Sequence, residues 1–462
     1  MQNLSSTPFP EKWLSVIGIG EEGWSGLGAE SRSRIQQAPA IFGSPRHLGM
    51  LPGSASEFEA SEDRRFTWSR RMEEDFPRLR EQGPGTVVLA TGDPLCYGVG
   101  AKLLREGFRI EEIRFLPSPS AYSLACGRLG WSLPEVETLT VHGRPHETLH
   151  PFVQPGVRML ILSWNEHSPG QVARLLEDRG FGPSRITVLE HLGGERERLF
   201  SREARGWSEP AGAALNVVAV ECFPGPEAQL LPRVPGLPDE AFEHDGQITK
   251  REVRAMTLAQ LMPIPGQRLW DLGAGCGSVA VEWLRSDPRN TAVAVERHPE
   301  RLQLLERNAV ALGVRPRLEI VEGHLPQVLP ELPAPHAVFV GGGISTEVLS
   351  HAWRVLPVHG RLVANAVTLE SERTLLDWQA RHGGELRRIA ISRAEPVGPY
   401  LGWRGLMPVT QLSQLRQPSS GQGDSTEEVQ DHALGADAAG FDSAQPPVVT
   451  PANAGIQSPG NR

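Results

Sequence analysis

The chain has 462 residues, of which 39% are hydrophobic and 22% charged, a composition typical of a soluble globular protein with two or three domains. The net charge is −9, and the segment beyond Gln417 accounts for −5 of it, with six acidic residues and one arginine. The nearly balanced remainder offers no basic face for nucleic acid. The sequence shows no apolar run of about 18 residues that could span a membrane and no signal peptide. We therefore expect a cytoplasmic protein that binds neither nucleic acid nor membrane.

The cysteines are too scattered to form a recognisable framework. Cys96, Cys126, Cys222 and Cys276 show no C-x-x-C spacing and no accompanying histidine pattern. We therefore expect neither a metal site nor a disulfide network.

The first 223 residues alternate strand-like apolar runs with helical segments. The strands that we expect span residues 14–19, 86–90, 113–116, 158–163, 185–190 and 214–220. The first strand leads into Gly18-Ile-Gly20-Glu-Glu-Gly23, which fits G-x-G-x-x-G. We disfavour a dinucleotide site, because the following segment is itself rich in glycine and the next strand-like run, 40–42, ends in Gly43 without an acid for a ribose.

Two further loops follow the next strands. One is Gly92-Asp93-Pro94, in which Asp93 alternatively caps a helix, and the other is Pro117-Ser118-Pro119-Ser120-Ala121. The three loops, in this order and spacing, resemble the tetrapyrrole methylase family over residues 13–223. The resemblance implies two α/β subdomains that bind S-adenosylmethionine in the cleft between them. The cofactor-binding residues that it implies are Gly18, Gly20, Gly23, Gly92, Asp93, Pro94, Ser118 and Ser120.

Two segments lack a regular pattern. Residues 224–238 contain five prolines, so we place a linker at 224–244. Residues 417–462 are rich in Ser, Gly, Gln, Asp, Ala and Pro, and we expect a disordered tail there.

Between the linker and the tail, residues 245–411 again alternate strands and helices. The expected strands are 268–271, 291–296, 317–321, 336–340, 360–366 and 386–392. Such alternation predicts an α/β domain with a parallel, doubly wound, Rossmann-like sheet.

The most specific motif of this half is Asp271-Leu-Gly-Ala-Gly-Cys-Gly277, which joins a strand to a helix. Glycines at this spacing let the backbone approach a ligand closely, and Glu296 ends the next strand, where an acid accepts hydrogen bonds from ribose hydroxyls. An acid at Asp271 suits the cationic end of S-adenosylmethionine and would repel a pyrophosphate; the alternative is an ordinary glycine-rich turn. The half resembles class I S-adenosylmethionine-dependent methyltransferases. The cofactor-binding residues expected here are Thr249, Asp271, Gly273, Gly275, Gly277, Ser278, Glu296 and Gly323.

The two halves together resemble the bifunctional methyltransferases of cobalamin biosynthesis. Matching stretches include residues 139–145, 245–250, 340–343 and 362–370. The resemblance implies two S-adenosylmethionine sites and a precorrin substrate, a reduced tetrapyrrole. It also implies methylation of C-5 by the first half, and methylation of C-15 with decarboxylation of a ring acetate by the second. We also expect a homo-oligomer.

The substrate carries many carboxylates, so each cleft should present cationic side chains. The substrate-binding candidates are His142, Arg144, His146, Arg251, Arg254, Gly341, Gly342 and Asn365, although solvated surface charge is the alternative for the cations. No catalytic acid or base stands out. Glycines at 341–343 replace the Asn/Asp-Pro-Pro-aromatic motif of amine methyltransferases, which disfavours N-methylation of nucleic acid or protein. A methyltransferase for another modified tetrapyrrole and a tetrapyrrole-binding protein with one inactive site remain open.

Overall fold

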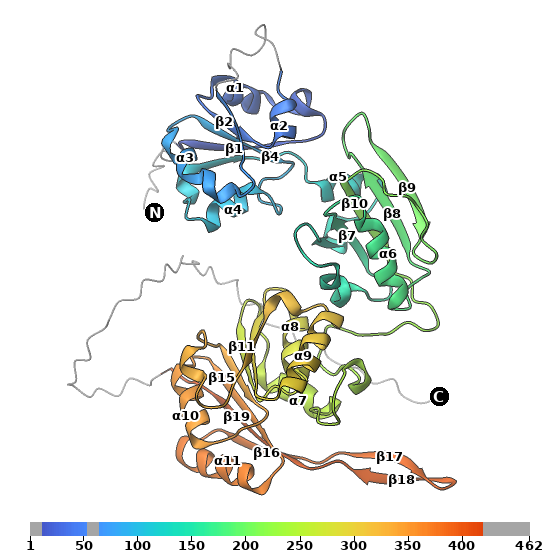
Figure 1. Ribbon diagram of the computed structural model, residues 1–462, viewed down its shortest axis with the longest axis vertical. Coiled ribbons are helices and arrows are strands. Elements are labelled where there is room, and N and C mark those ends of the chain that lie inside the picture. The colour runs from blue at the N-terminus through green and yellow to red at the C-terminus, as the bar shows by residue number, and fades with distance from the viewer. Residues whose placement is uncertain (1–11, 53–63, 419–462) are drawn as a thin grey trace, which may run out of the picture. The chain divides into compact units, whose positions relative to one another are not determined.

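A computed structural model describes residues 12–52 and 64–418 (Figure 1). The expected disordered tail therefore lies outside the described residues, apart from its first two positions.

The first subdomain is built on a five-stranded parallel sheet with the order β3-β2-β4-β1-β5. Its strands are β1 (Leu14–Ile19), β2 (Ile41–Gly43), β3 (Arg65–Thr67), β4 (Thr86–Thr91) and β5 (Ile113–Leu116). Its helices are α1 (Ala29–Gln37), α2 (Pro45–Gly49), α3 (Phe76–Glu81) and α4 (Val99–Arg105). The central strands β1 and β4 are buried almost throughout, which explains why their continuous apolar runs identify them in the sequence.

The second subdomain has a mixed sheet with the order β6-β7-β10-β8-β9. Only β6 and β7 are parallel; β10 pairs antiparallel with both β7 and β8, and β9 pairs antiparallel with β8. The strands are β6 (Glu137–Thr140), β7 (Arg158–Leu162), β8 (Arg185–Glu190), β9 (Arg198–Glu203) and β10 (Asn216–Glu221). The helices are α5 (Ala121–Leu129) and α6 (Ser168–Asp178).

The C-terminal domain has a seven-stranded sheet with the order β13-β12-β11-β14-β15-β19-β16. Its strands are β11 (Arg268–Leu272), β12 (Thr291–Glu296), β13 (Leu318–Glu322), β14 (Ala337–Val340), β15 (Arg361–Ala366), β16 (Glu385–Ile389) and β19 (Val409–Leu415). The first five positions of the sheet are parallel, as expected. The expectation of a wholly parallel sheet is wrong at one edge, because β19 runs antiparallel to both β15 and β16.

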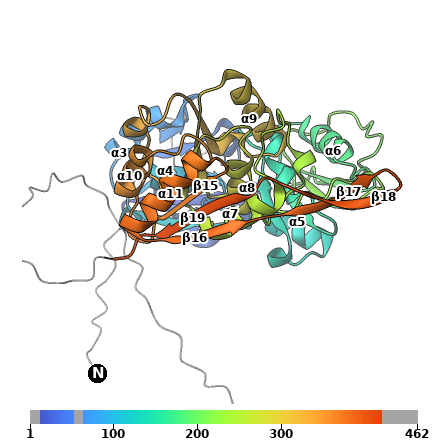
Figure 2. The same ribbon diagram turned by 90° about the horizontal axis from the view of Figure 1, so that it is seen from below.

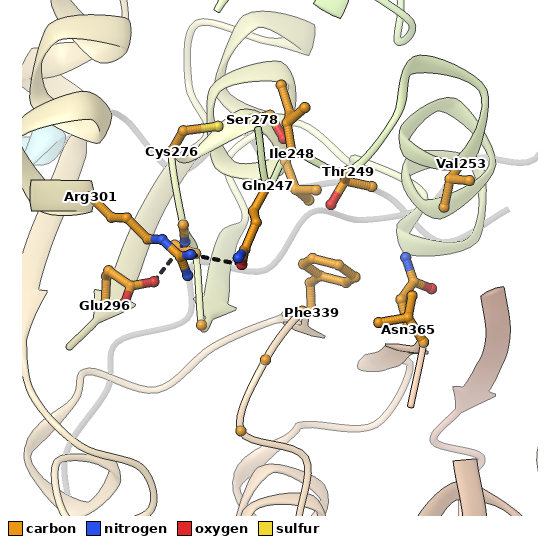
Figure 3. A pocket seen from close by; sticks show the side chains of 18 of the residues that line it. Gln247, Ile248, Thr249, Val253, Cys276, Ser278, Glu296, Arg301, Phe339 and Asn365 are labelled. Atoms are coloured by element: carbon orange, nitrogen blue, oxygen red, sulfur yellow. Dashed lines mark hydrogen bonds between the residues drawn. The ribbon is translucent and has the colours of Figure 1, made fainter. Parts of the chain in front are cut away.

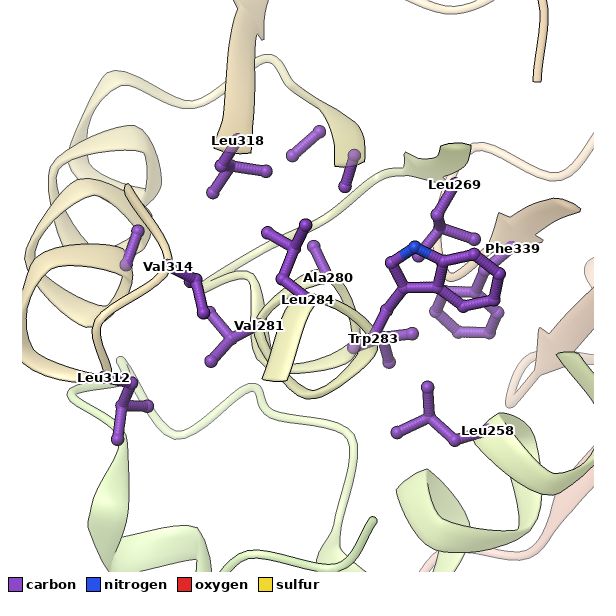
Figure 4. Packing of buried hydrophobic residues seen from close by; sticks show 14 of the residues in the cluster. Leu258, Leu269, Ala280, Val281, Trp283, Leu284, Leu312, Val314, Leu318 and Phe339 are labelled. Carbon is purple, nitrogen blue, oxygen red and sulfur yellow. The ribbon is translucent and has the colours of Figure 1, made fainter. Parts of the chain in front are cut away.

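Helices cover both faces of this sheet. The helices are α7 (Arg251–Leu261), α8 (Ser278–Ser286), α9 (Pro299–Ala311), α10 (Thr346–Val355) and α11 (Leu369–His382). Along β11, Leu269 packs with the first three helices and its neighbour Trp270 with α10 and α11, as the two-residue period of a strand requires. Figure 4 shows the first of these clusters, in which Trp283 of α8 lies among Leu258, Leu269 and Phe339. Because Trp283 is fully buried, truncating it to alanine would cost about 3–5 kcal/mol.

A two-stranded hairpin extends from the antiparallel edge of the sheet. Strands β17 (Ser392–Val397) and β18 (Tyr400–Gly405) pair only with each other and project away from β16 and β19 in both views (Figures 1 and 2). Tyr400, Leu401 and Trp403 are each at least 74% exposed.

The proline-rich segment is packed against the C-terminal domain. Leu231, Leu237 and Phe242 are buried in the same cluster as Trp283. The carboxylate of Glu282 in α8 accepts hydrogen bonds from the backbone N–H groups of Gly236 and Leu237, at 2.6 and 2.9 Å. The expected linker is therefore part of the C-terminal core from Leu231 onward.

Candidate active sites

A pocket of about 710 Å³ opens at the carboxyl ends of the five parallel strands of the C-terminal sheet (Figure 3). This is where open α/β sheets bind their ligands, and the volume suits a cofactor with part of a second ligand. Of the residues expected from the sequence, Thr249, Gly273, Gly275, Ser278, Glu296, Gly323, Gly341, Gly342 and Asn365 line it.

The two glycine loops of this pocket touch each other. A Cβ on Gly273, after β11, would lie 2.7 Å from the Cα and N of Gly342, after β14, so position 273 has no room for a side chain, whereas a Cβ on Gly342 would meet Gly273 at an ordinary contact distance of 3.6 Å. Gly275 has a φ of +58°, and a Cβ built on it would meet no atom closer than Gln247 O, at 4.0 Å. The backbone at Gly275 is therefore left bare for a ligand, while Gly273 and Gly277 serve close packing and the turn into α8.

The Glu296 carboxylate is held at the pocket wall by backbone donors. Oε2 accepts from Gly275 N at 2.8 Å, and Oε1 accepts from Arg297 N and His298 N at 2.8 and 3.0 Å. These bonds fix the carboxylate while lone pairs remain for the hydroxyls of a ribose. Arg301 approaches the same wall and binds Gln247 Oε1 at 2.7 Å and Asp245 Oδ2 at 2.8 Å.

Asp271 lies behind the pocket and does not line it. Oδ2 accepts from Ala280 N at 3.0 Å, whereas the buried Oδ1 has no hydrogen-bond partner among the described residues. Burial raises the pKa of this carboxyl to about 7, an effect that the Ala280 N–H opposes and the negative charge of Glu296 reinforces. The sequence predicts that this carboxylate directly faces the cofactor. Because Asp271 does not line the pocket, its charge would instead act on a bound cation without direct contact. A cation in the pocket would favour the ionised form of Asp271.

The two arginines expected to bind substrate here do not line the pocket. Arg251 is exposed at the start of α7. Arg254 is fully buried, and it pairs with Glu282 at 2.6 Å and Asp239 at 3.2 Å and donates to the carbonyls of Thr249 and Leu237. The expectation for Arg254 is thus corrected: its guanidinium cannot reach a substrate and instead fixes the loop that carries Thr249.

A second pocket, of about 530 Å³, lies between the two N-terminal subdomains and is lined by parts of all three expected loops. The loops are joined to one another by Ser118, whose hydroxyl donates to Gly18 O at 2.8 Å and whose N–H donates to Gly92 O at 3.1 Å. A Cβ on Gly18 would lie 1.8 Å from Gly92 O. Gly18, Gly92 and Ser118 therefore form the junction, and Gly20, Gly92, Asp93 and Ser120 face the pocket.

The alternative role for Asp93 as a helix cap is wrong. Its Oδ1 accepts from Leu95 N at 2.8 Å in a local turn, and α4 begins at Val99 with Gly98 as its N-cap. Ser120, in contrast, does cap a helix, because its hydroxyl accepts from Ser123 N at the start of α5. Pro94 and Gly23 do not line the pocket; Gly23 has a φ of +61°.

Cationic side chains surround the N-terminal pocket. His142 and Arg144 line it as expected, whereas His146 does not. The sequence analysis missed Arg46, His47 and Glu21, which also line it. Arg46 pairs with Glu21 and donates to Thr91 Oγ1 at 2.9 Å, the same atom that lies 2.9 Å from His47 Nε2. Arg46 and His47 are consecutive residues of α2 and belong to no motif, and Glu21 occupies a variable position of the Gly18–Gly23 loop; only folding brings the two segments together.

Burial and the Arg46 charge lower the pKa of His47 to about 4, so its ring is neutral at pH 7. Within residues 12–52 and 64–418, no group of three or more His, Cys, Asp or Glu side chains is placed to hold a metal ion. In the same part of the chain, no helix has both the length and the apolar character needed to cross a membrane.

Two family models match the chain: the tetrapyrrole (corrin/porphyrin) methylases over residues 14–205 and a precorrin methyltransferase domain over residues 240–416. The fold and its two pockets thus define a two-domain methyltransferase. A precorrin-6Y C(5,15)-methyltransferase (decarboxylating) from Sinorhizobium sp. is 46% identical over 403 residues, which cover 87% of this chain and 96% of that protein. A protein of the same name from Mycobacterium tuberculosis (strain CDC 1551 / Oshkosh) is 41% identical over 405 residues, covering 87% and 99%. The chain belongs to the family of precorrin-6Y C(5,15)-methyltransferases (decarboxylating).

Relatives of the separate C-terminal domain also exist. A protein of Pyrobaculum calidifontis named as a probable cobalt-precorrin-6B C(15)-methyltransferase (decarboxylating) is 37% identical over 181 residues, 38% of this chain and 93% of that protein. The crystal structure of the C-terminal domain of precorrin-6Y C5,15-methyltransferase from Rhodobacter capsulatus is similar with 46% identity and a TM-score of 0.39, covering 40% of this chain and all of that one.

Proposed function

We propose that this protein uses two S-adenosylmethionine sites to methylate C-5 and C-15 of a reduced precorrin-6 and to decarboxylate one ring acetate, in cobalamin biosynthesis. The observation that carries the proposal is the presence of two separate pockets, each built on one of the two glycine-loop sets, in a chain that matches its relatives over 87% of its length.

The division of labour rests on the relatives. A protein named for C(15) methylation and decarboxylation alone aligns with 181 residues, close to the length of the precorrin methyltransferase domain at 240–416. We therefore assign methylation at C-15 and decarboxylation to the C-terminal pocket, and methylation at C-5 to the N-terminal pocket.

The residues of the C-terminal pocket fit the cofactor. S-adenosylmethionine supplies an electrophilic methyl group on a cationic sulfur. Glu296 would accept hydrogen bonds from its ribose hydroxyls, the bare backbone at Gly275 would permit close approach, and the orphaned Oδ1 of Asp271 would place negative charge behind its cationic end. The glycines at 341–343 leave room for a broad planar substrate, so the main task of the protein is to align two carbons and exclude water.

In the N-terminal pocket, Arg46, Arg144 and His142 are placed to receive substrate carboxylates. Arg46 is already paired with Glu21, so a carboxylate would compete with that side chain. Arg144 makes no ion pair with any residue that the structure describes, and it lies over the ring of Tyr97, with its guanidinium carbon 5.5 Å from the ring centroid. We therefore assign the stronger carboxylate contact to Arg144.

Mass spectrometry tests the function directly. The full chain, S-adenosylmethionine and a reduced precorrin-6 should yield a product with two added methyl groups and one carbon dioxide lost. When the two halves are produced as separate fragments, the N-terminal one should methylate C-5, and the C-terminal one should methylate C-15 and release carbon dioxide. The cut belongs between Gln229 and Leu230, because Gly225 and Gln229 hydrogen-bond to the N-terminal half, whereas Leu231 and Leu237 pack with the C-terminal core. An N-terminal fragment that releases carbon dioxide, or one fragment that performs both methylations, would contradict the assignment.

We further propose that the protein is a cytoplasmic homo-oligomer. The exposed apolar side chains of the β17–β18 hairpin, Tyr400, Leu401 and Trp403, support association, because contact with a second copy would remove their apolar surface from water. Sedimentation equilibrium of the full chain should give a multiple of 50.4 kDa. A monomer across the concentration range would refute this proposal.

A further inference from the structure

Three polar side chains from three different elements meet beside the C-terminal pocket. They are Thr257 on α7, Asn365 on β15 and Gln411 on β19, and the two amides are direct partners across the antiparallel strand pair. Thr257 and Gln411 are fully buried, and Asn365 is 9% exposed. Of the three, only Asn365 lines the pocket.

The hydrogen bonds fix which way the Asn365 amide points. The Thr257 hydroxyl has one proton, which it donates to Val253 O at 2.8 Å. Its oxygen must therefore accept from Asn365 Nδ2 at 2.8 Å and Gln411 Nε2 at 3.2 Å. Gln411 Nε2 also donates to Asn365 Oδ1 at 3.0 Å. With both atoms of the Asn365 amide assigned, one N–H and one lone pair remain for a ligand.

The arrangement leaves a buried group without a partner. Gln411 Oε1 and the neighbouring Thr410 Oγ1 make no hydrogen bond in the described part of the chain. An orphaned buried polar atom costs about 1–3 kcal/mol. The chain thus tolerates a loss of folding free energy at Gln411 Oε1. In return, the amide protons of Gln411, and not its oxygen, point toward Thr257 and Asn365.

Asn365 stands at the apolar side of the pocket. In Figure 3, Glu296 and Arg301 lie on one side, Asn365 and Val253 on the other, and Phe339 between them. Val253 packs with Ile389, Val409 and Ile391, and all four line the pocket. A ligand group bound by Asn365 would thus have a neutral donor and an apolar wall beside it.

We propose that Asn365 binds the carboxylate of the ring acetate that is lost as carbon dioxide, and that Thr257 and Gln411 are positioning residues that aim its amide. The inference rests on the proposed function. In the reaction, the bond between the acetate methylene and its carboxylate breaks, and its electron pair moves into the ring, which methylation has left electron-poor. Carbon dioxide leaves, and a proton from water ends on the former methylene carbon.

A neutral amide suits this step better than a cation. The carboxylate loses its negative charge as the carbon–carbon bond breaks, so an ion pair would stabilise the ground state more than the transition state. A hydrogen bond from Asn365 orients the group, while the wall of Val253, Ile389 and Val409 withholds water from it.

The test separates decarboxylation from methyl transfer. The full chain is given S-adenosylmethionine and reduced precorrin-6, and mass spectrometry follows methyl gain and carbon dioxide release. Thr257→Val keeps the shape of the side chain but removes its hydrogen bonds, and Thr257→Ser restores them. We expect Thr257→Val to lower carbon dioxide release per methyl added by roughly 10- to 100-fold, with accumulation of a methylated acid, and Thr257→Ser to recover it.

If Thr257→Val melts below the assay temperature, Asn365→Asp provides an independent variant. This substitution replaces the amide nitrogen by an oxygen and so places a carboxylate against the substrate carboxylate. It should lower carbon dioxide release by a larger factor than it lowers C-15 methylation. Unchanged carbon dioxide release in these variants, or an equal loss of methylation and decarboxylation, would overturn the inference alone. A wild-type chain that does not methylate the precorrin would overturn the proposed function and this inference with it.

Discussion

Replacing Arg254 with methionine separates a structural from a substrate-binding role for this side chain. The variant removes the cation that Glu282 and Asp239 share inside the C-terminal domain. Breaking one side of a buried ion pair costs about 3–5 kcal/mol. Glu282 keeps its two backbone donors, and Asp239 keeps Arg393 at 3.4 Å, so we expect the lower end, about 3 kcal/mol.

Such a loss is readily measured. In a domain of this size, each kcal/mol lowers Tm by about 2–4 °C, so calorimetry of the full chain should show one transition lowered by roughly 6–12 °C. Arg251→Met is the matched control: it is exposed on the same helix and should shift Tm by less than about 2 °C. KM for the precorrin, measured below the transition, should not change in Arg254→Met. An unchanged Tm together with a raised KM would refute the assignment.

Three further predictions follow from the pockets and the tail. Gly18→Ala should abolish cofactor binding at the N-terminal site alone and lower the free energy of unfolding by about 1–3 kcal/mol, because its Cβ would overlap Gly92 O. In the control Gly28→Ala, whose Cβ meets no atom within 4 Å, calorimetric titration should show unchanged cofactor binding. In Gly18→Ala, which leaves only the C-terminal site, affinity for S-adenosylmethionine should rise about tenfold from pH 6 to 8, because a bound cation favours the ionised form of Asp271, whose pKa is about 7. Adding Asp271→Asn should remove this pH dependence. Removal of residues 418–462, too poor in large apolar side chains to bury, should leave Tm and turnover unchanged; a fall of several degrees would show that they dock.

The pKa of Asp271 also makes the free energy of unfolding depend on pH. Its folded value of about 7 lies above the ordinary 3.8, so between these values the native chain holds a proton that the unfolded chain has released. The contribution of Asp271 to the free energy of unfolding therefore falls as pH rises through this window and is level above it.

Much of the fold is readable from the sequence because the central strands are buried on both sides. The bounds of β1, β8 and β12 are those expected from their apolar runs. The hairpin strands β17 and β18 carry no such run, because both are exposed, β17 is polar and contains a proline, and β18 is interrupted by glycine. The antiparallel edge formed by β19 depends on long-range pairing with β15, which no local pattern reports.

The candidate sites can be predicted from the sequence only where the backbone conformation requires glycine. Glycine loops that must touch, such as those at Gly18 and Gly273, are marked by their missing side chains. Side-chain roles are harder, because sequence does not distinguish a buried cation from an exposed one. The sequence predicts that Arg254 binds substrate, but its guanidinium forms an internal ion pair with Glu282. Arg46 belongs to no motif, yet it lines the N-terminal pocket.

The central claim is that one chain holds two independent methyl-transfer sites, and cofactor stoichiometry tests it most directly. Titration calorimetry of the full chain should give two equivalents of S-adenosylmethionine. Gly18→Ala should retain only the C-terminal equivalent, and Glu296→Ala, which removes the carboxylate at the C-terminal pocket wall, should retain only the N-terminal one. A single equivalent in the unaltered chain, or both equivalents lost in either variant, would contradict the account.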